Sequence, residues 1–326
     1  MNSTLKFSHI EKRATLPNFF IVGAAKSGTT SLYYYLKQHP EIFMPHIKEP
    51  LFFCFHDIPD HEFANVIYPN DPDEYIRDFQ GYADLFLKQA GPKAVGEASA
   101  GYLFYYKKTI QNIRKLLPDW ENIKIIIILR NPVEASFSHY SMYQMRGDEI
   151  RTFEESLDNE KQVLSAGKGL DTLVHFQRFF YYSQVKAYLE SFNHVRIYLY
   201  DDLVRNQLET IQAMYTFLGV DSSYIPDMEI KYNATGTPKS EFIHNFLTKP
   251  NLLKKVLKPL VSMISSDETI IRMIDLIKSK NLSTSKPLIN NVMKMRLTEY
   301  YREDILKLQK LIKRDLGHWL EITHLN

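Results

Sequence analysis

The first residues that could do chemistry lie in a short loop, residues 23–28, with the sequence Gly-Ala-Ala-Lys-Ser-Gly. An apolar run over residues 19–22 precedes this loop, and a helical pattern follows it. Such a loop binds anions, because its backbone N–H groups converge and the helix N-terminus adds the positive end of its dipole. We therefore predict a phosphate site to which Lys26 adds a cation. The predicted contacts are Lys26, Ser27, Gly28, Thr29, Thr30 and Ser31.

The spacing of Gly23 and Gly28 is that of a nucleoside-triphosphate loop, G-x-x-x-x-G. In that loop a Lys-Ser or Lys-Thr pair follows the second glycine, but here Thr29 and Thr30 follow it. The lysine lies inside the loop instead, where it can reach a phosphate or a bridging oxygen. A P-loop nucleotide kinase stays open as an alternative, which Mg²⁺-dependent binding of ATP would favour. An ordinary strand-to-helix turn is the simplest alternative.

A second cation follows a buried strand later in the chain. Residues 123–130, IKIIIILR, form the apolar run that is typical of a strand buried on both faces of a parallel sheet. A Walker-type strand would end in an aspartate that holds Mg²⁺, whereas this one ends in Arg130. Pro132 can start a helix, which places Ser138 about two turns along it. Arg130 and Ser138 can therefore bind one phosphate together; a solvent-exposed arginine is the alternative.

Three segments resemble the sulfotransferase family. KSGTTS at 26–31 resembles the family's 5′-phosphosulfate loop, and LRNPVEASFSHY at 129–140 resembles its 3′-phosphate motif. IKEPLFF at 47–53 resembles the K-E-x-x-F-F segment of the heparan-sulfate and carbohydrate branch. The resemblance covers most of the chain. It implies a sulfotransferase that uses 3′-phosphoadenosine 5′-phosphosulfate (PAPS) as its donor, with a phosphate at each end of the nucleoside and no metal requirement.

The resemblance also implies a catalytic base. In members of the family, this role is assigned to the glutamate of the K-E-x-x-F-F segment. The corresponding residue in this sequence is Glu49. A carboxylate can take the proton of the acceptor, and apolar neighbours raise its pKa toward a useful value. Lys48 would lie near the donor sulfate or orient the base, and Lys26 would stabilise charge on the bridging oxygen. A surface Lys–Glu pair is the alternative for this segment.

Substrate contacts are predicted from weaker segments. GEASAGYLF at 96–104 resembles the family's G-E-x-S-x-x-Y-L, although Ala98 stands where some members have lysine. We expect Glu97 to touch the acceptor or to brace one of the lysines, and Tyr102 to contact substrate or to pack.

Two further pairs of residues are candidates for binding. Arg178 and Tyr181 are candidates for acceptor or nucleotide contacts, although the family tends to have glycine after this arginine. Lys239 and Ser240 lie in a turn that resembles the segment closing over the nucleotide phosphates.

The fold expected from these patterns is α/β, with a mostly parallel central sheet flanked by helices and the P-loop-like turn at its C-terminal edge. Residues 1–17 are expected to be loose, and residues 18–326 to form a single domain. Strands are predicted over 19–23, 94–98, 123–129 and 195–200. Helices are predicted over 29–38, 73–90, 104–117, 132–146, 153–165, 175–192, 208–219 and 292–316, with an extended or turning segment over 41–55.

Composition narrows the class of protein. The formal net charge of the 326-residue chain is +2, so no overall field points to nucleic acid or to a membrane surface. The one cysteine, Cys54, allows no intramolecular disulfide and reads as a small buried hydrophobe. No stretch is long and apolar enough for a signal peptide or a membrane span. We expect a cytoplasmic enzyme that sulfates a glycan or small molecule; a catalytically silent PAPS-binding module is a further alternative.

Overall fold

The computed structural model describes residues 15–59, 76–87, 91–165, 174–228 and 289–321. The chain divides into two compact units, one made of residues 1–228 and 290–326 and the other of residues 229–289. Every helix and strand described below belongs to the first unit. The predicted loose segment 1–17 and the single domain 18–326 include residues outside the described ranges, so both stay predictions.

The centre of the described unit is a parallel sheet with the order β2-β3-β1-β4-β5. All four neighbouring pairs are parallel. The strands are β1 (Phe19–Gly23), β2 (Ile42–Phe43), β3 (Ala94–Ala98), β4 (Lys124–Leu129) and β5 (His194–Leu199). The predicted α/β fold with a parallel sheet is therefore confirmed. Since parallel strands share one direction, their carboxyl ends meet at one edge of the sheet.

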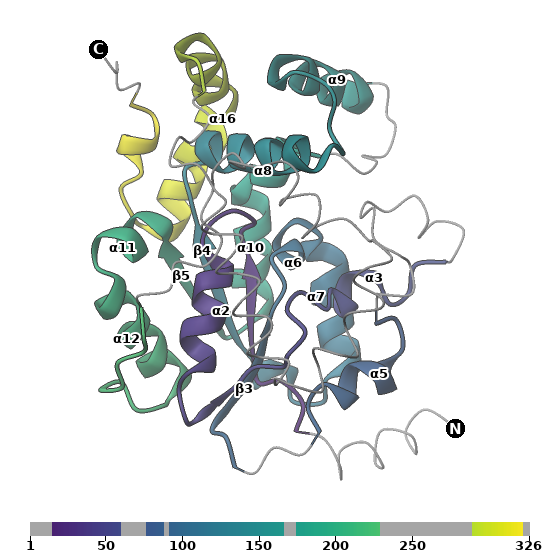
Figure 1. The fold of residues 1–326 in the computed structure, drawn as a ribbon, viewed down its shortest axis with the longest axis vertical. Coiled ribbons are helices and arrows are strands. Elements are labelled where there is room, and N and C mark those ends of the chain that lie inside the picture. Colours follow the sequence, from purple (N-terminus) through teal and green to yellow (C-terminus); the bar gives the residue numbers. More distant parts are fainter. Residues whose placement is uncertain (1–14, 60–75, 88–90, 166–173, 229–288, 322–326) are drawn as a thin grey trace, which may run out of the picture. The chain divides into compact units, whose positions relative to one another are not determined.

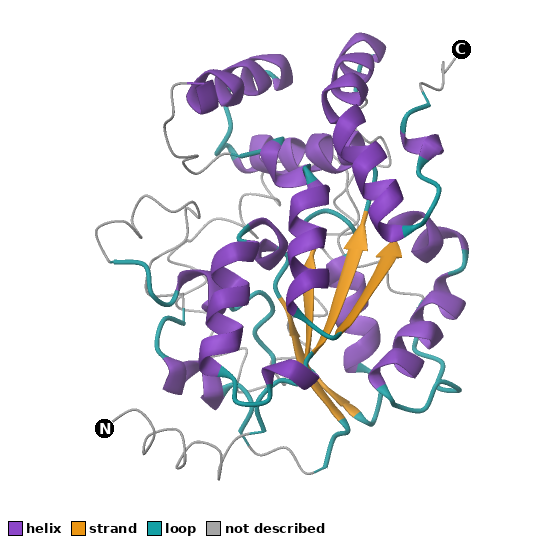
Figure 2. Cartoon of the chain, turned by 180° about the vertical axis from the view of Figure 1, so that it is seen from behind, coloured by secondary structure: helices purple, strands orange, loops and turns teal. Residues whose placement is uncertain are grey.

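Helices cover both faces of this sheet. Helices α2 (Thr29–Lys37) and α12 (Gln207–Leu218) pack together on one face, and α7 (Tyr106–Leu116) and α10 (Tyr181–Ser191) pack together on the other (Figures 1 and 2). Helix α8 (Pro132–Arg146) lies across the carboxyl edge of the sheet and contacts α16 (Asn291–Ile312) (Figure 1). The remaining helices are α3 (Phe52–Phe55), α5 (Phe79–Asp84), α6 (Gly101–Phe104), α9 (Phe153–Ser165) and α11 (Tyr200–Arg205), with short 3-10 turns η2 (Trp120–Asn122), η3 (Gln177–Phe179) and η4 (Gly317–Trp319).

The strands at the centre of the sheet owe their position to their apolar sequences. β1 and the isoleucine run of β4 are buried along almost their whole length, as expected of strands covered on both faces. β5 lies at the edge of the sheet, and all its residues except Leu199 are partly or fully exposed. The core around them contains Trp319, and it contains Cys54, which is buried as predicted.

One predicted helix begins later than expected, and another ends earlier. The segment 175–192 becomes η3 followed by α10, and the carboxylate of Glu160 accepts the backbone N–H groups of residues 175–177, where this segment begins. The last helix ends at Ile312, since Lys313 takes a left-handed φ of 52°. The expected continuation of this helix to residue 316 is therefore wrong.

Three shorter corrections concern turns. Residues 52–55, expected to be part of an extended or turning segment, form one helical turn whose four residues are all buried. Only Phe79–Asp84 is helical within the described part of the predicted helix 73–90, because Asp78 caps it by accepting the N–H of Gly81 at 2.8 Å. The predicted helix 104–117 breaks at Tyr105 into α6 and α7.

Candidate active site

The loop between β1 and α2 is positioned by its neighbours at the carboxyl edge. The N–H of Ala24 donates to the carbonyl of Ile128 in β4 at 2.6 Å. At Gly23, a Cβ would lie 2.5 Å from the Cβ of Leu103, so only glycine allows this approach to α6. Gly28 has a left-handed φ of 87°, which turns the chain into α2. The two glycines of the motif are therefore required by the geometry of the loop.

Several N–H groups of this loop have no acceptor among the residues that the structure describes. Among the described residues, no backbone carbonyl accepts the N–H groups of Ala25, Lys26 or Gly28. Helix α2 starts immediately afterwards at Thr29, and the N–H groups of a first helical turn have no intrahelical partner. The loop and the helix start together offer the set of donors that an anion requires.

The ammonium of Lys26 lies in the same place. Its Nζ is 3.5 Å from the sulfur of Met142 on α8, and no carboxylate within the described ranges pairs with it. Burial lowers the pKa of Lys26 to about 8, the charges of Arg146 and Arg130 add to this shift, and the charge of Glu49 opposes it. A partly buried cation among other cations favours an anionic ligand.

Arg130 joins the end of β4 to this loop. Its Nη1 donates to the carbonyl of Lys26 at 3.2 Å, and its guanidinium lies 4.8 Å from the ring centre of Tyr200. Its Nη2 donates to Glu134, one helical turn on, at 2.8 Å. The structure therefore brings the two predicted phosphate-binding segments to one edge of the sheet, with Arg130 in direct contact with the loop.

Two predicted hydroxyls lie near these cations. Ser138 is on α8 and almost buried, and its hydroxyl has no hydrogen-bond partner in the described part of the chain. The buried hydroxyl of Tyr181 also has none. Burial raises the pKa of Tyr181, while the neighbouring Ser27 and Arg130 act in the opposite direction. Tyr181 thus lies beside the loop between β1 and α2, where a buried hydroxyl without a partner in the described residues suits a ligand oxygen.

Glu49 and Lys48 form an ion pair on a strained turn. Their side chains are 33% and 18% exposed, so both remain accessible. Glu49 has a positive φ of 59°, and its N–H donates to the carbonyl of Ala98 at 3.0 Å. Non-glycine residues are seldom left-handed, and they persist where surrounding contacts hold them. The carboxylate that the sequence indicates as the base is therefore fixed near Lys26 by its backbone.

The turn after Glu49 is held by a hydrogen-bond network centred on Glu97, whose side chain is completely buried. One carboxylate oxygen accepts the hydroxyls of Tyr82 and Tyr102, both at 2.9 Å, and the other accepts the hydroxyl of Ser99 at 2.8 Å. Two of these hydroxyl oxygens accept backbone N–H groups in turn. Ser99 accepts that of Leu51 and Tyr102 that of Phe53, both at 3.3 Å.

Tyr102 packs inside the fold with Glu97, which is one of the two outcomes expected for it, and no ion pair in the described part of the chain joins Glu97 to a lysine. Contact of either residue with the acceptor stays a prediction. Both side chains are fully buried, and their polar atoms bond to each other and to the turn after Glu49. Burial raises the pKa of Glu97 to about 7, against the effect of its three hydroxyl donors. Their role is to hold the segment that carries Glu49.

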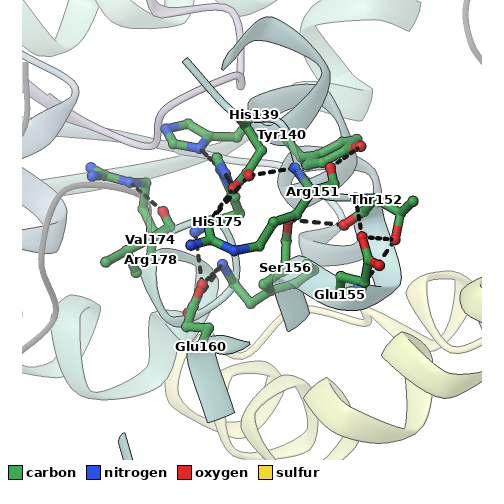
Figure 3. Close-up of polar contacts among 12 residues, drawn as sticks. His139, Tyr140, Arg151, Thr152, Glu155, Ser156, Glu160, Val174, His175 and Arg178 are labelled. Atoms are coloured by element: carbon green, nitrogen blue, oxygen red, sulfur yellow. Dashed lines mark hydrogen bonds and ion pairs between the residues drawn. The ribbon is translucent and has the colours of Figure 1, made fainter. Parts of the chain in front are cut away.

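The other predicted contacts fall elsewhere. Arg178 is buried, with its guanidinium 4.5 Å from the ring centre of Phe104 and its Nε donating to the carbonyl of Val174 at 3.5 Å (Figure 3). Its contact with a substrate stays a prediction. Lys239 and Ser240 lie outside the described residues. Within the described ranges, no group of three or more His, Cys, Asp and Glu side chains could hold a metal ion.

Several residues of the site carried no recognisable signal in the sequence. Met142 and Tyr200 contact Lys26 and Arg130 from elements whose position depends on the fold. Ser99 could have been noticed, since it follows Glu97 by two positions in the segment already compared with the family. A cluster of buried polar residues around His139 and His175 was also missed.

Comparison with known proteins agrees with this geometry. Residues 17–224 match the model of a family described as the sulfotransferase family. The chain is 32% identical over 150 residues to a membrane-associated sulfotransferase, kil1, of Dictyostelium discoideum, a match that covers 45% of this chain and 28% of that protein. It is 27% identical over 179 residues to human carbohydrate sulfotransferase 15, which covers 45% of this chain and 31% of the relative. The chain thus spans under a third of these relatives.

A solved structure matches over a longer range. The crystal structure of a sulfotransferase from Alicyclobacillus acidocaldarius is 29% identical, with a TM-score of 0.68, and the match covers 94% of this chain and 100% of that one. No helix in the described part of this chain is long and apolar enough to cross a membrane.

The role of the Glu97 network can be tested with two matched substitutions. Tyr102→Phe removes the hydroxyl that links Glu97 to the N–H of Phe53, whereas Tyr82→Phe removes a hydroxyl that also bonds Glu97 but holds no backbone group of the turn. Because a net hydrogen bond is worth about 1 kcal/mol, we expect Tyr102→Phe to speed amide exchange at residues 49–53 roughly fivefold.

Hydrogen exchange followed by mass spectrometry or NMR measures this effect. Tyr82→Phe is the control, and it should leave exchange in the turn close to that of the unsubstituted protein. Equal acceleration by the two substitutions would contradict the proposed link.

Proposed function

Because the chain belongs to the sulfotransferase family, we propose that it transfers the sulfuryl group of PAPS to a hydroxyl or amine of a carbohydrate acceptor. One observation carries this proposal: the loop that holds Lys26 and the strand end that holds Arg130 meet, with Nη1 of Arg130 donating to the carbonyl of Lys26. Two neighbouring cationic sites suit a donor with two separate phosphates.

The residues present fit such a donor. The free N–H groups of the loop and the start of α2 would receive the 5′-phosphosulfate, together with the ammonium of Lys26. Arg130 and the unpartnered hydroxyl of Ser138 would hold the 3′-phosphate, with Tyr181 beside the loop. PAPS supplies an activated sulfuryl group whose leaving phosphate needs no metal when cations already surround it.

Glu49 supplies the base in this proposal. Its carboxylate is partly exposed and lies close enough to Lys26 for its charge to affect the pKa of the lysine. It would remove the proton of the attacking hydroxyl or amine, while Lys26 stabilises the negative charge that develops on the leaving oxygen. Lys48 pairs with Glu49 and so orients it.

The acceptor class rests on relatives. Human carbohydrate sulfotransferase 15 and a human heparan sulfate N-deacetylase/N-sulfotransferase are both similar to this chain. Their names indicate carbohydrate acceptors, which is also the branch that the segment around Glu49 resembles. We therefore propose a glycan or a related sugar as the acceptor.

Ligand-dependent thermal stability tests the donor. A ligand that binds only the folded state raises the unfolding midpoint, so 3′-phosphoadenosine 5′-phosphate (PAP) should raise it and ATP with Mg²⁺ should not. Lys26→Ala and Arg130→Ala should each reduce the shift caused by PAP. A shift with ATP and Mg²⁺ alone would favour the P-loop kinase instead.

The pH dependence of PAP affinity tests Lys26. Its ammonium is half deprotonated near pH 8 in the free protein, and the charged form binds the anion better. The affinity of the unsubstituted protein should therefore fall as the pH rises above about 8, by up to tenfold per pH unit. Titration calorimetry at several pH values measures it.

Lys26→Arg is the control, because a guanidinium stays charged throughout this range and the phosphates no longer titrate above about pH 7. Its PAP affinity should change little between the same pH values. The same slope in both proteins would mean that another group causes the pH dependence.

Glu49→Gln tests the base. The substitution keeps the size of the side chain but removes its basicity, so sulfuryl transfer should fall by about 10² or more while PAP affinity stays within about twofold. Transfer from labelled PAPS to a panel of unsulfated glycans, with and without free amines, measures the rate. Glu154→Gln, an exposed carboxylate on α9, is the control. If Glu49→Gln transfers the sulfuryl group as fast as the unsubstituted protein, Glu49 is not the catalytic base.

A further inference from the structure

A chain of three buried side chains leads from the surface toward the site. Nδ1 of His139, on α8, lies 2.9 Å from Nδ1 of His175. Nε2 of His175 lies 3.3 Å from a carboxylate oxygen of Glu149. None of the three is more than 3% exposed. Figure 3 shows the two imidazole rings meeting through one nitrogen each, so that the second nitrogen of His139 faces away from His175.

The direction of the hydrogen bonds in this chain is set at Glu149. Its other oxygen accepts the N–H of Arg151 at 2.9 Å and a guanidinium nitrogen of the same residue at 3.3 Å. A carboxylate in such an ion pair can only accept, so Nε2 of His175 carries a hydrogen and donates it.

The rest follows from the two nitrogens of a neutral imidazole, of which one donates and the other accepts. Nδ1 of His175 must accept, because Nε2 of this ring donates. Nδ1 of His139 must therefore donate, which leaves Nε2 of His139 with a lone pair and no hydrogen.

Both rings are held neutral by their surroundings. Burial lowers the pKa of His175 to about 4, Glu149 opposes this shift, and the charges of Arg178 and Arg151 add to it. Burial also lowers the pKa of His139 far below its usual value, and Arg178, His175, Lys26 and Arg146 lower it further.

His139 lies on the face of α8 that borders the catalytic residues. It follows Ser138, and Met142 and Tyr143 lie on the same face, one turn further along the helix. Met142 contacts the ammonium of Lys26, and the ring of Tyr143 packs on that of His139 with centroids 4.9 Å apart. The charge of Glu49 affects the pKa of Tyr143, so this face is near both the lysine and the base.

We propose that Glu149 and His175 hold His139 in the tautomer with an unprotonated Nε2, and that this nitrogen accepts a hydrogen bond from an O–H or N–H group of the acceptor. The second half of this proposal rests on the proposed sulfotransferase function. Glu149 and His175 are then positioning residues that act through His139, and they select acceptors that present a donor group to it.

The tautomer can be measured without any substrate. In the full-length protein labelled with ¹⁵N-histidine, Nε2 of His139 should resonate as an unprotonated nitrogen and Nδ1 as a protonated one. The coupling between the two Nδ1 atoms through their hydrogen bond identifies the pair. An imidazolium at His139, or a hydrogen on its Nε2, would overturn the proposal.

Glu149→Gln should reverse the whole chain. The amide oxygen of glutamine can still accept from Arg151, which turns its NH₂ group toward Nε2 of His175. That nitrogen would then accept, His175 would donate from Nδ1 to Nδ1 of His139, and Nε2 of His139 would gain the hydrogen. Glu155→Gln is the matched control, since within the described ranges the carboxylate of Glu155 bonds to Thr152 alone.

Kinetics test the contact with the acceptor. With a glycan that the protein sulfates, Glu149→Gln should lower kcat/KM for the acceptor roughly tenfold, because an acceptor nitrogen becomes a donor. PAP affinity should stay unchanged, which a general loss of structure would not allow. Equal kcat/KM in Glu149→Gln and Glu155→Gln would overturn the contact. If no glycan of the panel is sulfated, the proposed function and this contact fail together, whereas the tautomer is still decided by NMR.

Discussion

The buried carboxylate of Glu97 is the interaction on which the catalytic edge of the sheet depends. It lies at the end of β3, next to the central strand, and gathers three hydroxyls from α5, α6 and the strand end. Burying a carboxylate is unfavourable unless hydrogen bonds satisfy it. Here the same hydroxyls that satisfy it hold the N–H groups of Leu51 and Phe53. The left-handed turn at Glu49 is thereby tied to the most buried part of the fold.

Much of the fold could be predicted, because its strands are long apolar runs. The isoleucine run of β4 and the apolar run of β1 are buried on both faces, and such sequences have few other stable arrangements. Helix ends were harder to predict, since they depend on contacts between distant segments. The N–H groups at the start of the segment 175–192 donate to Glu160 on α9, and nothing local to that segment indicates this contact.

The residues of the site also divide into those that the sequence could predict and those that depend on the fold. The anion-binding loop at residues 23–28 and Arg130 could be predicted. The glycine spacing and a cation at the end of a strand can both be recognised within a short stretch of sequence. Glu97 was identified as important, but its role was not, since its partner Tyr82 comes from another element and its burial depends on the fold. The relay from Glu149 to His139 has no sequence pattern at all: its members are separated in the chain and meet only when α8 packs against η3.

The ion pair between Arg130 and Glu134 has a consequence for turnover. Without a ligand, Glu134 acts as a built-in counter-ion, so that the guanidinium does not stand uncompensated beside the loop. Glu134 is itself more than half exposed and is free to rotate into solvent. An anion that binds Arg130 would compete with Glu134 for the guanidinium, and Glu134 would pair with Arg130 again when the anion leaves. If the chain binds PAPS as proposed, this competition would lower its affinity for the nucleotide before and after transfer, and it would speed the exchange of spent nucleotide for fresh donor.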